Sequence, residues 1–199
     1  MSAAFDGPMG FERRMSGEAR VGLEAGDRRI RGTAIVFHSL SENLGGFREI
    51  IHPEAVDRTL REGIDVRALV DHDSAKIMGR LSAGTLTLSK TARGLAVEND
   101  PPNTSYARDL LVSIDRRDIT GMSFGFRVAP DGDAFRQDDQ TGEWIRDVHD
   151  MLVSEVSFVT FPAYVATDAR EAQRSMRAAQ ALLARPSLAQ LRRRLALLR

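Results

Sequence analysis

Large apolar residues alternate with small or polar ones along residues 120–128, and this is the pattern around which the chain is best understood. Side chains alternate between the two faces of a β-strand, so one face of this predicted strand is apolar: Met122, Phe124, Phe126 and Val128. The other face carries small or polar residues: Gly121, Ser123, Gly125 and Arg127. We therefore expect an almost bare strip with one hydroxyl at its centre, which leaves room for a bound peptide and a base. A serine on a plain solvent face is the alternative.

Shorter runs of the same kind predict further strands at 28–37, 47–51, 66–70, 81–90, 94–98, 144–149 and 151–161. Helical spacing predicts helices over 54–61 and 105–115, and a charged loop is expected over 131–142. The chain lacks the regular strand–helix alternation of a parallel α/β fold. The predicted fold class is therefore mainly β with inserted helices (α+β), a mostly antiparallel barrel or sandwich.

Charge divides the chain into three parts, predicted as an N-terminal arm (1–27), a body (28–167) and a basic tail (168–199). The formal net charge is zero. The last 31 residues nevertheless hold eight arginines and one acidic residue. Their leucines recur at helical spacing beside the arginines, at Leu188, Leu191, Leu195 and Leu198. Such a tail either folds onto the body or binds a partner, namely scaffold or capsid protein, with nucleic acid or a membrane surface as a third alternative.

Composition excludes several classes of protein. Cysteine is absent, so the chain has no disulfide and no thiolate nucleophile. No run approaches the roughly 18–20 apolar residues of a membrane span, and residues 1–20 lack the apolar core of a secretory signal. A reducing, cytoplasmic setting fits these observations.

His72 is the histidine with a candidate chemical role. It follows the apolar strand at 66–70, and alternation would place it on the face of Val66, Ala68 and Val70. Asp71 and Asp73 flank it and are expected to point away from that face. His38 and His52 are expected to make local hydrogen bonds, and His149 to lie on the surface. A strand-end histidine bonded to a nearby carbonyl is the alternative for His72.

Glu155 interrupts a run, 151–161, that is otherwise nearly all apolar or small. A strand apolar on both faces is typical of burial on both sides, and a buried carboxylate needs a donor. An imidazole N–H is a suitable one. Serine, histidine and carboxylate together can form an activated nucleophile. An edge strand with Glu155 facing water is the alternative.

Seven short motifs carry a resemblance to a known family. They are GTAIVF at 32–37, EIIHPEAV at 49–56, ALVDHD at 68–73, GR at 79–80, GL at 94–95, SFGF at 123–126 and EVSFVTFPA at 155–163. In this order and at these distances, they resemble the prohead proteases of tailed phages. These are capsid-maturation serine proteases whose fold is akin to the herpesvirus assemblins. The resemblance covers about residues 31–167.

The resemblance implies Ser123 as nucleophile, His72 as general base and Glu155 as third catalytic residue. Assemblins use a second histidine as the third member, so His149 is a fallback, and Asp71 or Asp73 compete for the same role. By the same analogy an arginine-containing loop supplies the oxyanion donor, which makes Arg80 or the backbone near Gly79 a candidate. Arg127, on the face of Ser123, is another. Gly121 and Gly125 would leave room for the substrate backbone.

The implied function is a serine endopeptidase that cuts scaffold segments of the capsid protein or a separate scaffold, and itself. It would act inside the assembling procapsid in the host cytoplasm. No cofactor is implied, and no metal-ligand cluster is evident at usable spacing. A homodimer is compatible with the resemblance; no specific nucleic acid and no membrane partner are expected.

Two other functions compete. A non-catalytic scaffold-binding or assembly protein on the same fold would act through the basic tail. An esterase is suggested by the letters GMSFG at 121–125, which match a nucleophile elbow. That elbow needs a strand-to-helix turn after the serine, whereas here the strand pattern continues.

Overall fold

The computed structural model describes residues 11–15, 21–23, 28–160, 176–177 and 180–181. Its strands are β1 (Glu12–Met15), β2 (Val21–Leu23), β3 (Ile30–Val36), β4 (Phe47–Ile51), β5 (Arg67–Val70), β6 (Asp73–Arg80), β7 (Leu86–Lys90), β8 (Gly94–Asn99), β9 (Gly121–Val128), β10 (Asp133–Gln137), β11 (Trp144–Val148) and β12 (Met151–Val159). Its helices are the 3₁₀ turn η1 (Pro53–Val56), α1 (Asp57–Arg61) and α2 (Ser105–Asp115).

These strands form three sheets, with orders β1-β9-β12-β5-β6, β2-β3-β8-β7 and β10-β11-β4. Most neighbours are antiparallel, but β12 runs parallel to β5 and β11 runs parallel to β4. The prediction of a mainly β, α+β fold is confirmed. The described strands do not close into a barrel, so that part of the prediction is not confirmed.

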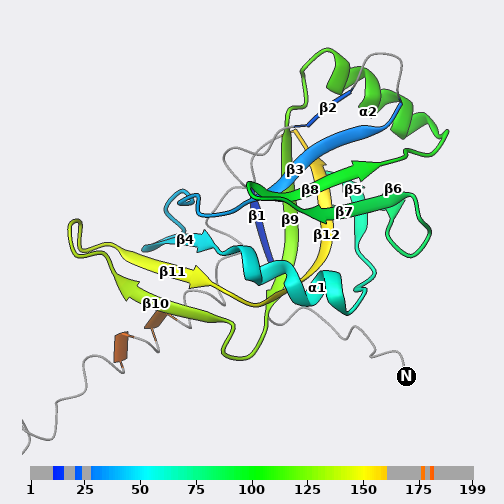
Figure 1. Ribbon diagram of the computed structural model, residues 1–199. Coiled ribbons are helices and arrows are strands. Elements are labelled where there is room, and N and C mark those ends of the chain that lie inside the picture. The colour runs from blue at the N-terminus through cyan, green and yellow to red at the C-terminus, as the bar shows by residue number, and fades with distance from the viewer. Residues whose placement is uncertain (1–10, 16–20, 24–27, 161–175, 178–179, 182–199) are drawn as a thin grey trace, which may run out of the picture.

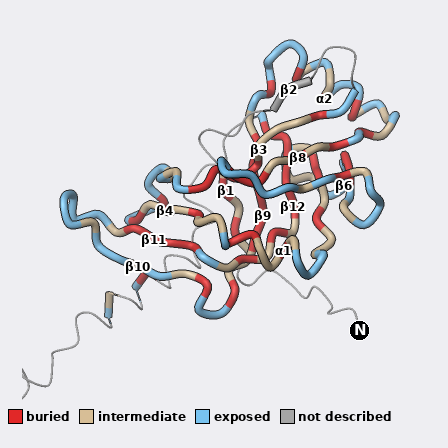
Figure 2. The backbone as a smooth tube through the Cα atoms, viewed as in Figure 1, coloured by how far each residue is buried: buried red, intermediate tan, exposed pale blue. Residues whose placement is uncertain are grey.

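The core lies between the five-stranded and four-stranded sheets (Figures 1 and 2). The five-stranded sheet contributes Met122, Phe124, Phe126, Val156 and Phe158, and the four-stranded sheet contributes Ile30, Ile35, Leu95 and Val97. Helix α2 covers one end with its apolar face. Truncating one of the buried phenylalanines to alanine costs about 3–5 kcal/mol in folds of this kind, so this apolar face fixes how β9 and β12 present their other face.

Two sequence expectations need correction. The loop expected over 131–142 contains strand β10, whose residues are mostly exposed and lack the apolar alternation that marks a strand. The strand expected over 81–90 begins only at Leu86, because the chain turns at 81–84, where Gly84 has a φ of +71°. β7 and β8 form an antiparallel hairpin with Lys90 opposite Leu95.

Most of the predicted C-terminal tail lies outside the described residues, so its helix stays a prediction. Met176 is buried against Leu44 and Phe47, in a small apolar cluster beside the three-stranded sheet. In the segment predicted as an N-terminal arm, residues 12–15 and 21–23 form strands that join two of the sheets. Among the described residues, no helix is long and apolar enough to cross a membrane.

Candidate active site

Strand β9 presents the two faces that the sequence predicts, but the serine face is covered. Met122, Phe124 and Phe126 pack into the core. Ser123, on the opposite face, has no exposed surface. The expectation of an open strip is therefore wrong, because strand β1 pairs along β9 and places Met15 opposite Ser123.

The two glycines on this face differ in how closely their neighbours approach. A Cβ atom on Gly125 would lie 2.4 Å from the Phe11 ring and 2.7 Å from Cγ of Glu155. On Gly121 it would meet Met15 no closer than 3.5 Å, an ordinary contact. The space at Gly125 is thus filled by Glu155 and Phe11, and only this glycine is required by its surroundings.

Glu155 faces the serine side of the sheet because β12 contains a bulge. Val153 pairs with Phe126 and Glu155 pairs with Gly125, so Ser154 is an extra residue between two successive pairs. Strict alternation along β12 would put position 155 on the core face with Val153, and the bulge moves it to the other face. Bulges commonly re-aim a side chain next to an active site. Glu155 is 7% exposed, as the apolar run around it predicts.

His72 comes from a tight turn rather than from a strand. Strand β5 ends at Val70, which pairs with Asp73 at the start of β6. The two residues between, Asp71 and His72, have φ values of +46° and +60°. A two-residue hairpin with positive φ at both positions is the turn that usually holds Asn-Gly or Asp-Gly. His72 therefore occupies a position that favours glycine.

The turn also places His72 on the opposite face of the sheet from the one that strand alternation predicts. On β5, Leu69 pairs with Ser157 of β12, and aligned residues of paired strands share a face. Ala68 therefore belongs to the core face, and simple alternation would have carried His72 to that face too. The turn redirects the imidazole to the other side of the sheet.

The structure brings His72 and Glu155 together. Nδ1 of His72 lies 2.6 Å from Oε1 of Glu155. The same oxygen accepts a bond of 3.2 Å from Nε of Arg13. Nε2 of His72 is buried and has no hydrogen-bond partner among the described residues. Because Nδ1 is engaged by the carboxylate, Nε2 is the ring nitrogen left to exchange a proton with another group.

Two serine hydroxyls lie side by side near this pair. Ser123 and Ser157 are directly opposite each other on β9 and β12, on the face of Glu155, and both are fully buried. Cβ atoms of such pairs are about 4.5–5.5 Å apart. The Ser123 hydroxyl donates to the carbonyl of Arg14, at 2.9 Å. Within the described part of the chain, the Ser157 hydroxyl has no partner.

The alternative third residues lie elsewhere. Nδ1 of His149 is 2.9 Å from Oε1 of Glu54, a residue of η1. Asp71 accepts bonds from the backbone N–H and hydroxyl of Thr160. Asp73 accepts from a backbone N–H in its own strand. Of the carboxylates and histidines considered from the sequence, Glu155 is the one bonded to His72.

The oxyanion candidates are placed differently from one another. Arg80 lies on β6, three strands from β9 in the sheet order, and its guanidinium binds Asp65 at 2.7 Å. This bond holds the pKa of Asp65 well below its usual range. Position 79 requires glycine because a Cβ atom there would collide with the side chain of Asn99. Arg127 lies on β9, on the face of Ser123. The structure thus does not bring Arg80 to the serine.

A separate group of possible metal ligands was not expected from the sequence. Donor atoms of His52, Glu54 and His149 lie within 4.8 Å of one another. The two imidazoles, however, stack with centroids 4.3 Å apart and planes 20° apart. A metal ion binds an imidazole nitrogen in the plane of its ring, and two nearly parallel planes do not share such a point. The arrangement is that of stacked rings, with His52 hydrogen-bonded to Asp147 and His149 to Glu54.

Serine hydrolases combine a serine hydroxyl with an imidazole whose other ring nitrogen is bonded to a carboxylate. Ser123, His72 and Glu155 supply these groups on one face of the sheet. The model of the caudovirus prohead serine protease family matches residues 17–181. The chain belongs to this family, and is in general terms a serine protease of phage capsid maturation. No curated protein and no solved structure matches it.

Sequence reasoning missed two parts of this site. Ser157 carried a weak signal, since it lies two residues after Glu155 and alternation puts both on one face. Strand β1 carried almost none, because its residues are mostly charged and show no apolar period. Its buried ion pairs are with residues of β4 and β11, more than 30 positions away in the sequence.

Proposed function

We propose that this protein is a serine endopeptidase that cuts scaffold segments of capsid protein, and itself, inside an assembling procapsid in the host cytoplasm. Family membership supports the general activity. The observation that carries the specific chemistry is the 2.6 Å bond between His72 and Glu155, which leaves Nε2 of His72 without a partner in the described structure.

The proposed reaction is acyl transfer through Ser123. Nε2 of His72 takes the hydroxyl proton as Oγ attacks the carbonyl carbon of the scissile peptide. Glu155 holds the Nδ1–H tautomer and stabilises the imidazolium. The same Nε2 then gives the proton to the leaving amine, and water hydrolyses the acyl-enzyme by the reverse sequence. No cofactor takes part in this scheme.

Two further residues have supporting roles in the proposal. Ser157, opposite Ser123, can hydrogen-bond the reacting hydroxyl once that hydroxyl leaves the Arg14 carbonyl. Arg127 is the oxyanion candidate favoured here, because it lies on the strand and face of Ser123, whereas Arg80 lies three strands away. An unpaired buried hydroxyl costs about 1–3 kcal/mol, so the unsatisfied Ser157 is better explained by a role in the reaction than by stability.

The test is co-expression of the protease with its capsid protein and scaffold segment. Ser123→Ala and His72→Ala are expected to leave the scaffold uncut and the protease unprocessed, while both variants unfold at nearly the wild-type denaturant concentration. Ser113→Ala, which removes an exposed hydroxyl on α2, is the matched control and should process normally. Full processing by Ser123→Ala would overturn the proposal.

A second function is favoured by one observation: Ser123 has no exposed surface. A protein whose serine is never reached would act as a silent assembly factor through its basic tail. The same experiment separates the two. In that case Ser123→Ala still yields mature capsids, whereas removal of residues 169–199 does not.

A further inference from the structure

Strand β1 occupies the edge of β9 beside Ser123. It pairs antiparallel with β9 over four residues, with Arg13 opposite Gly125 and Met15 opposite Ser123. β1 is the edge strand of its sheet. Extended peptides often bind proteins by adding a strand to such a sheet edge. If β1 left, the edge of β9 next to Ser123 would be open to a peptide in the same register.

The contacts of β1 engage the groups that the proposed reaction needs. The Ser123 hydroxyl donates its proton to the Arg14 carbonyl oxygen, so this proton is directed away from His72. Arg13 binds the same Glu155 oxygen as His72. A cation at this oxygen weakens the ability of Glu155 to stabilise a positively charged imidazole. The ring of Phe11 fills the space above Gly125.

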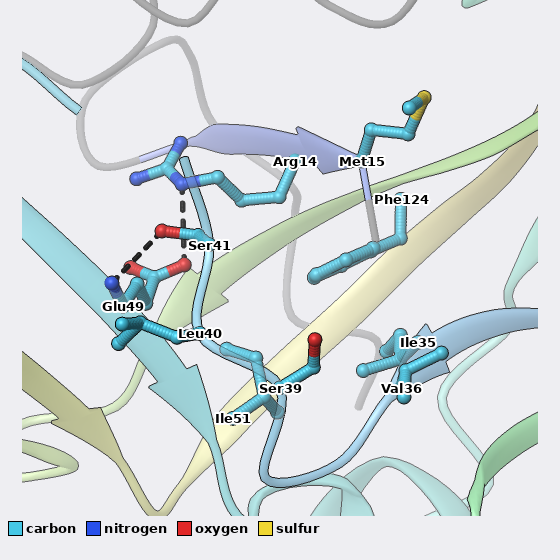
Figure 3. A pocket seen from close by; sticks show the side chains of 10 residues that line it. All are labelled: Arg14, Met15, Ile35, Val36, Ser39, Leu40, Ser41, Glu49, Ile51 and Phe124. Atoms are coloured by element: carbon cyan, nitrogen blue, oxygen red, sulfur yellow. Dashed lines mark hydrogen bonds and ion pairs between the residues drawn. The ribbon is translucent and has the colours of Figure 1, made fainter. Parts of the chain in front are cut away.

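β1 is anchored from its other face by buried ion pairs. Glu12 binds Arg146, and Arg14 binds Glu49 (Figure 3). The Glu12 and Arg14 side chains are also paired with each other. β1 thus adds one anion and one cation. Its departure leaves Arg146 paired with Glu49 and Asp133, with no change in the net charge of the buried cluster.

The match to the family begins at residue 17, two residues after β1 ends. The strand that covers Ser123 thus lies outside the matched part of the chain. We propose that β1 is a cis-acting inhibitory strand that occupies the place of a substrate strand on the edge of β9. This inference rests on the proposed function, because it takes Ser123 as the nucleophile.

If β1 takes the place of a substrate strand, its contacts predict the conformation and charge of the peptide that the site accepts. A productive peptide pairs with β9 in an extended conformation, in place of β1. Its residue opposite Gly125 is neutral, because a cation there repeats the contact of Arg13 with Glu155. Arg13 is therefore the residue of β1 that most directly lowers the reactivity of the His72–Glu155 pair.

The experiment measures the rate at which a fluorophosphonate labels Ser123, located by peptide mass spectrometry, in the full-length protein. Glu12→Gln/Arg14→Gln removes the anchor of β1 and leaves the Arg146–Glu49–Asp133 contacts in place. We expect labelling at least about tenfold faster, since the accessible fraction of the site sets the apparent rate. Arg29→Gln/Glu98→Gln, an exposed ion pair, is the matched control and should label at the wild-type rate.

A peptide of residues 9–17 supplies the second arm. Added to the unanchored variant, it should slow labelling, whereas the same residues in scrambled order should not. Labelling of Ser123 at equal rates with and without the anchor would overturn the inhibitory strand and leave the proposed function standing. A folded, unanchored variant that is never labelled at Ser123 would instead overturn the proposed function.

Discussion

The molecule holds two groups of charged residues, one on each face of strand β1, and they are built in opposite ways. Around Arg146, the described carboxylates and guanidiniums pair with one another: Glu12, Arg14, Glu49 and Asp133. Around Glu155, the carboxylate bonds His72 and Arg13 while Nε2 of the histidine has no described partner. The first group joins residues of β1, β4, β10 and β11, and the second joins residues of β1, β12 and the turn between β5 and β6.

The difference separates a structural cluster from a reactive one. Burial alone would lower the pKa of Arg146, but the carboxylates of Glu49 and Glu12 outweigh it and raise that pKa above its ordinary value. Arg146 therefore stays charged and links β11 to β1, β4 and β10. A group with an unused buried donor or acceptor gives up stability, and such groups need an explanation. The explanation that we propose here is proton transfer.

The largest effect should come from removing the charge of Glu155 without changing the size of its side chain. Glu155→Gln keeps the size of the side chain but no longer stabilises a charged imidazole. We expect the labelling rate of Ser123 to fall about 10³–10⁴-fold, as for the equivalent change in other serine hydrolases. Urea unfolding should show little change. A large loss of stability with an unchanged labelling rate would contradict the comparison.

Removing Arg146 from its cluster should instead lower the stability of the fold. Arg146→Met removes the buried cation that Glu12, Glu49 and Asp133 share, and leaves Glu12 and Glu49 with Arg14 as their remaining described partner. Loss of one partner of a buried ion pair costs about 3–5 kcal/mol, which urea unfolding will measure. Arg116→Met, which removes an exposed pair with Asp118, is the control, and should change stability by no more than about 0.5 kcal/mol.

The glycine pair on β9 sharpens the contrast within the site. Gly125→Ala forces Glu155 or its neighbours to move, because the added methyl would lie 2.7 Å from Cγ of Glu155. We expect a loss of about 1–3 kcal/mol of stability together with slower labelling of Ser123. Gly121→Ala meets only ordinary contacts, and should leave unfolding unchanged or slightly improve it. Equal effects of the two changes would contradict this account of the space at Gly125.

The smallest effect concerns the turn that aims His72. Both His72→Gly and His72→Ala remove the imidazole and should abolish labelling. Because φ at this position is +60°, glycine should be more stable there than alanine by about 1 kcal/mol. The difference between the two unfolding midpoints measures the strain accepted to place the histidine. An alanine variant at least as stable as the glycine variant would show that no such strain exists.

Much of the fold could be read from the sequence because its strands carry clear apolar alternation. The β9 strand, helix α2 and the burial of Glu155 follow from local pattern. The path of His72 does not, since alternation pointed it to the core and only the left-handed turn at Asp71 and His72 corrects that. The bulge at Ser154 is equally invisible to periodicity. β1 was missed because its residues show no apolar period, and its buried ion pairs are with residues of β4 and β11 that are distant in the sequence.

The central claim is that His72 takes the proton of the Ser123 hydroxyl. Its most direct test is the rate of fluorophosphonate labelling at Ser123 in wild type and in His72→Ala. We predict that the rate in His72→Ala falls at least about 10³-fold below the wild-type rate. An adduct on Ser157 instead, or equal rates in the two proteins, would contradict it.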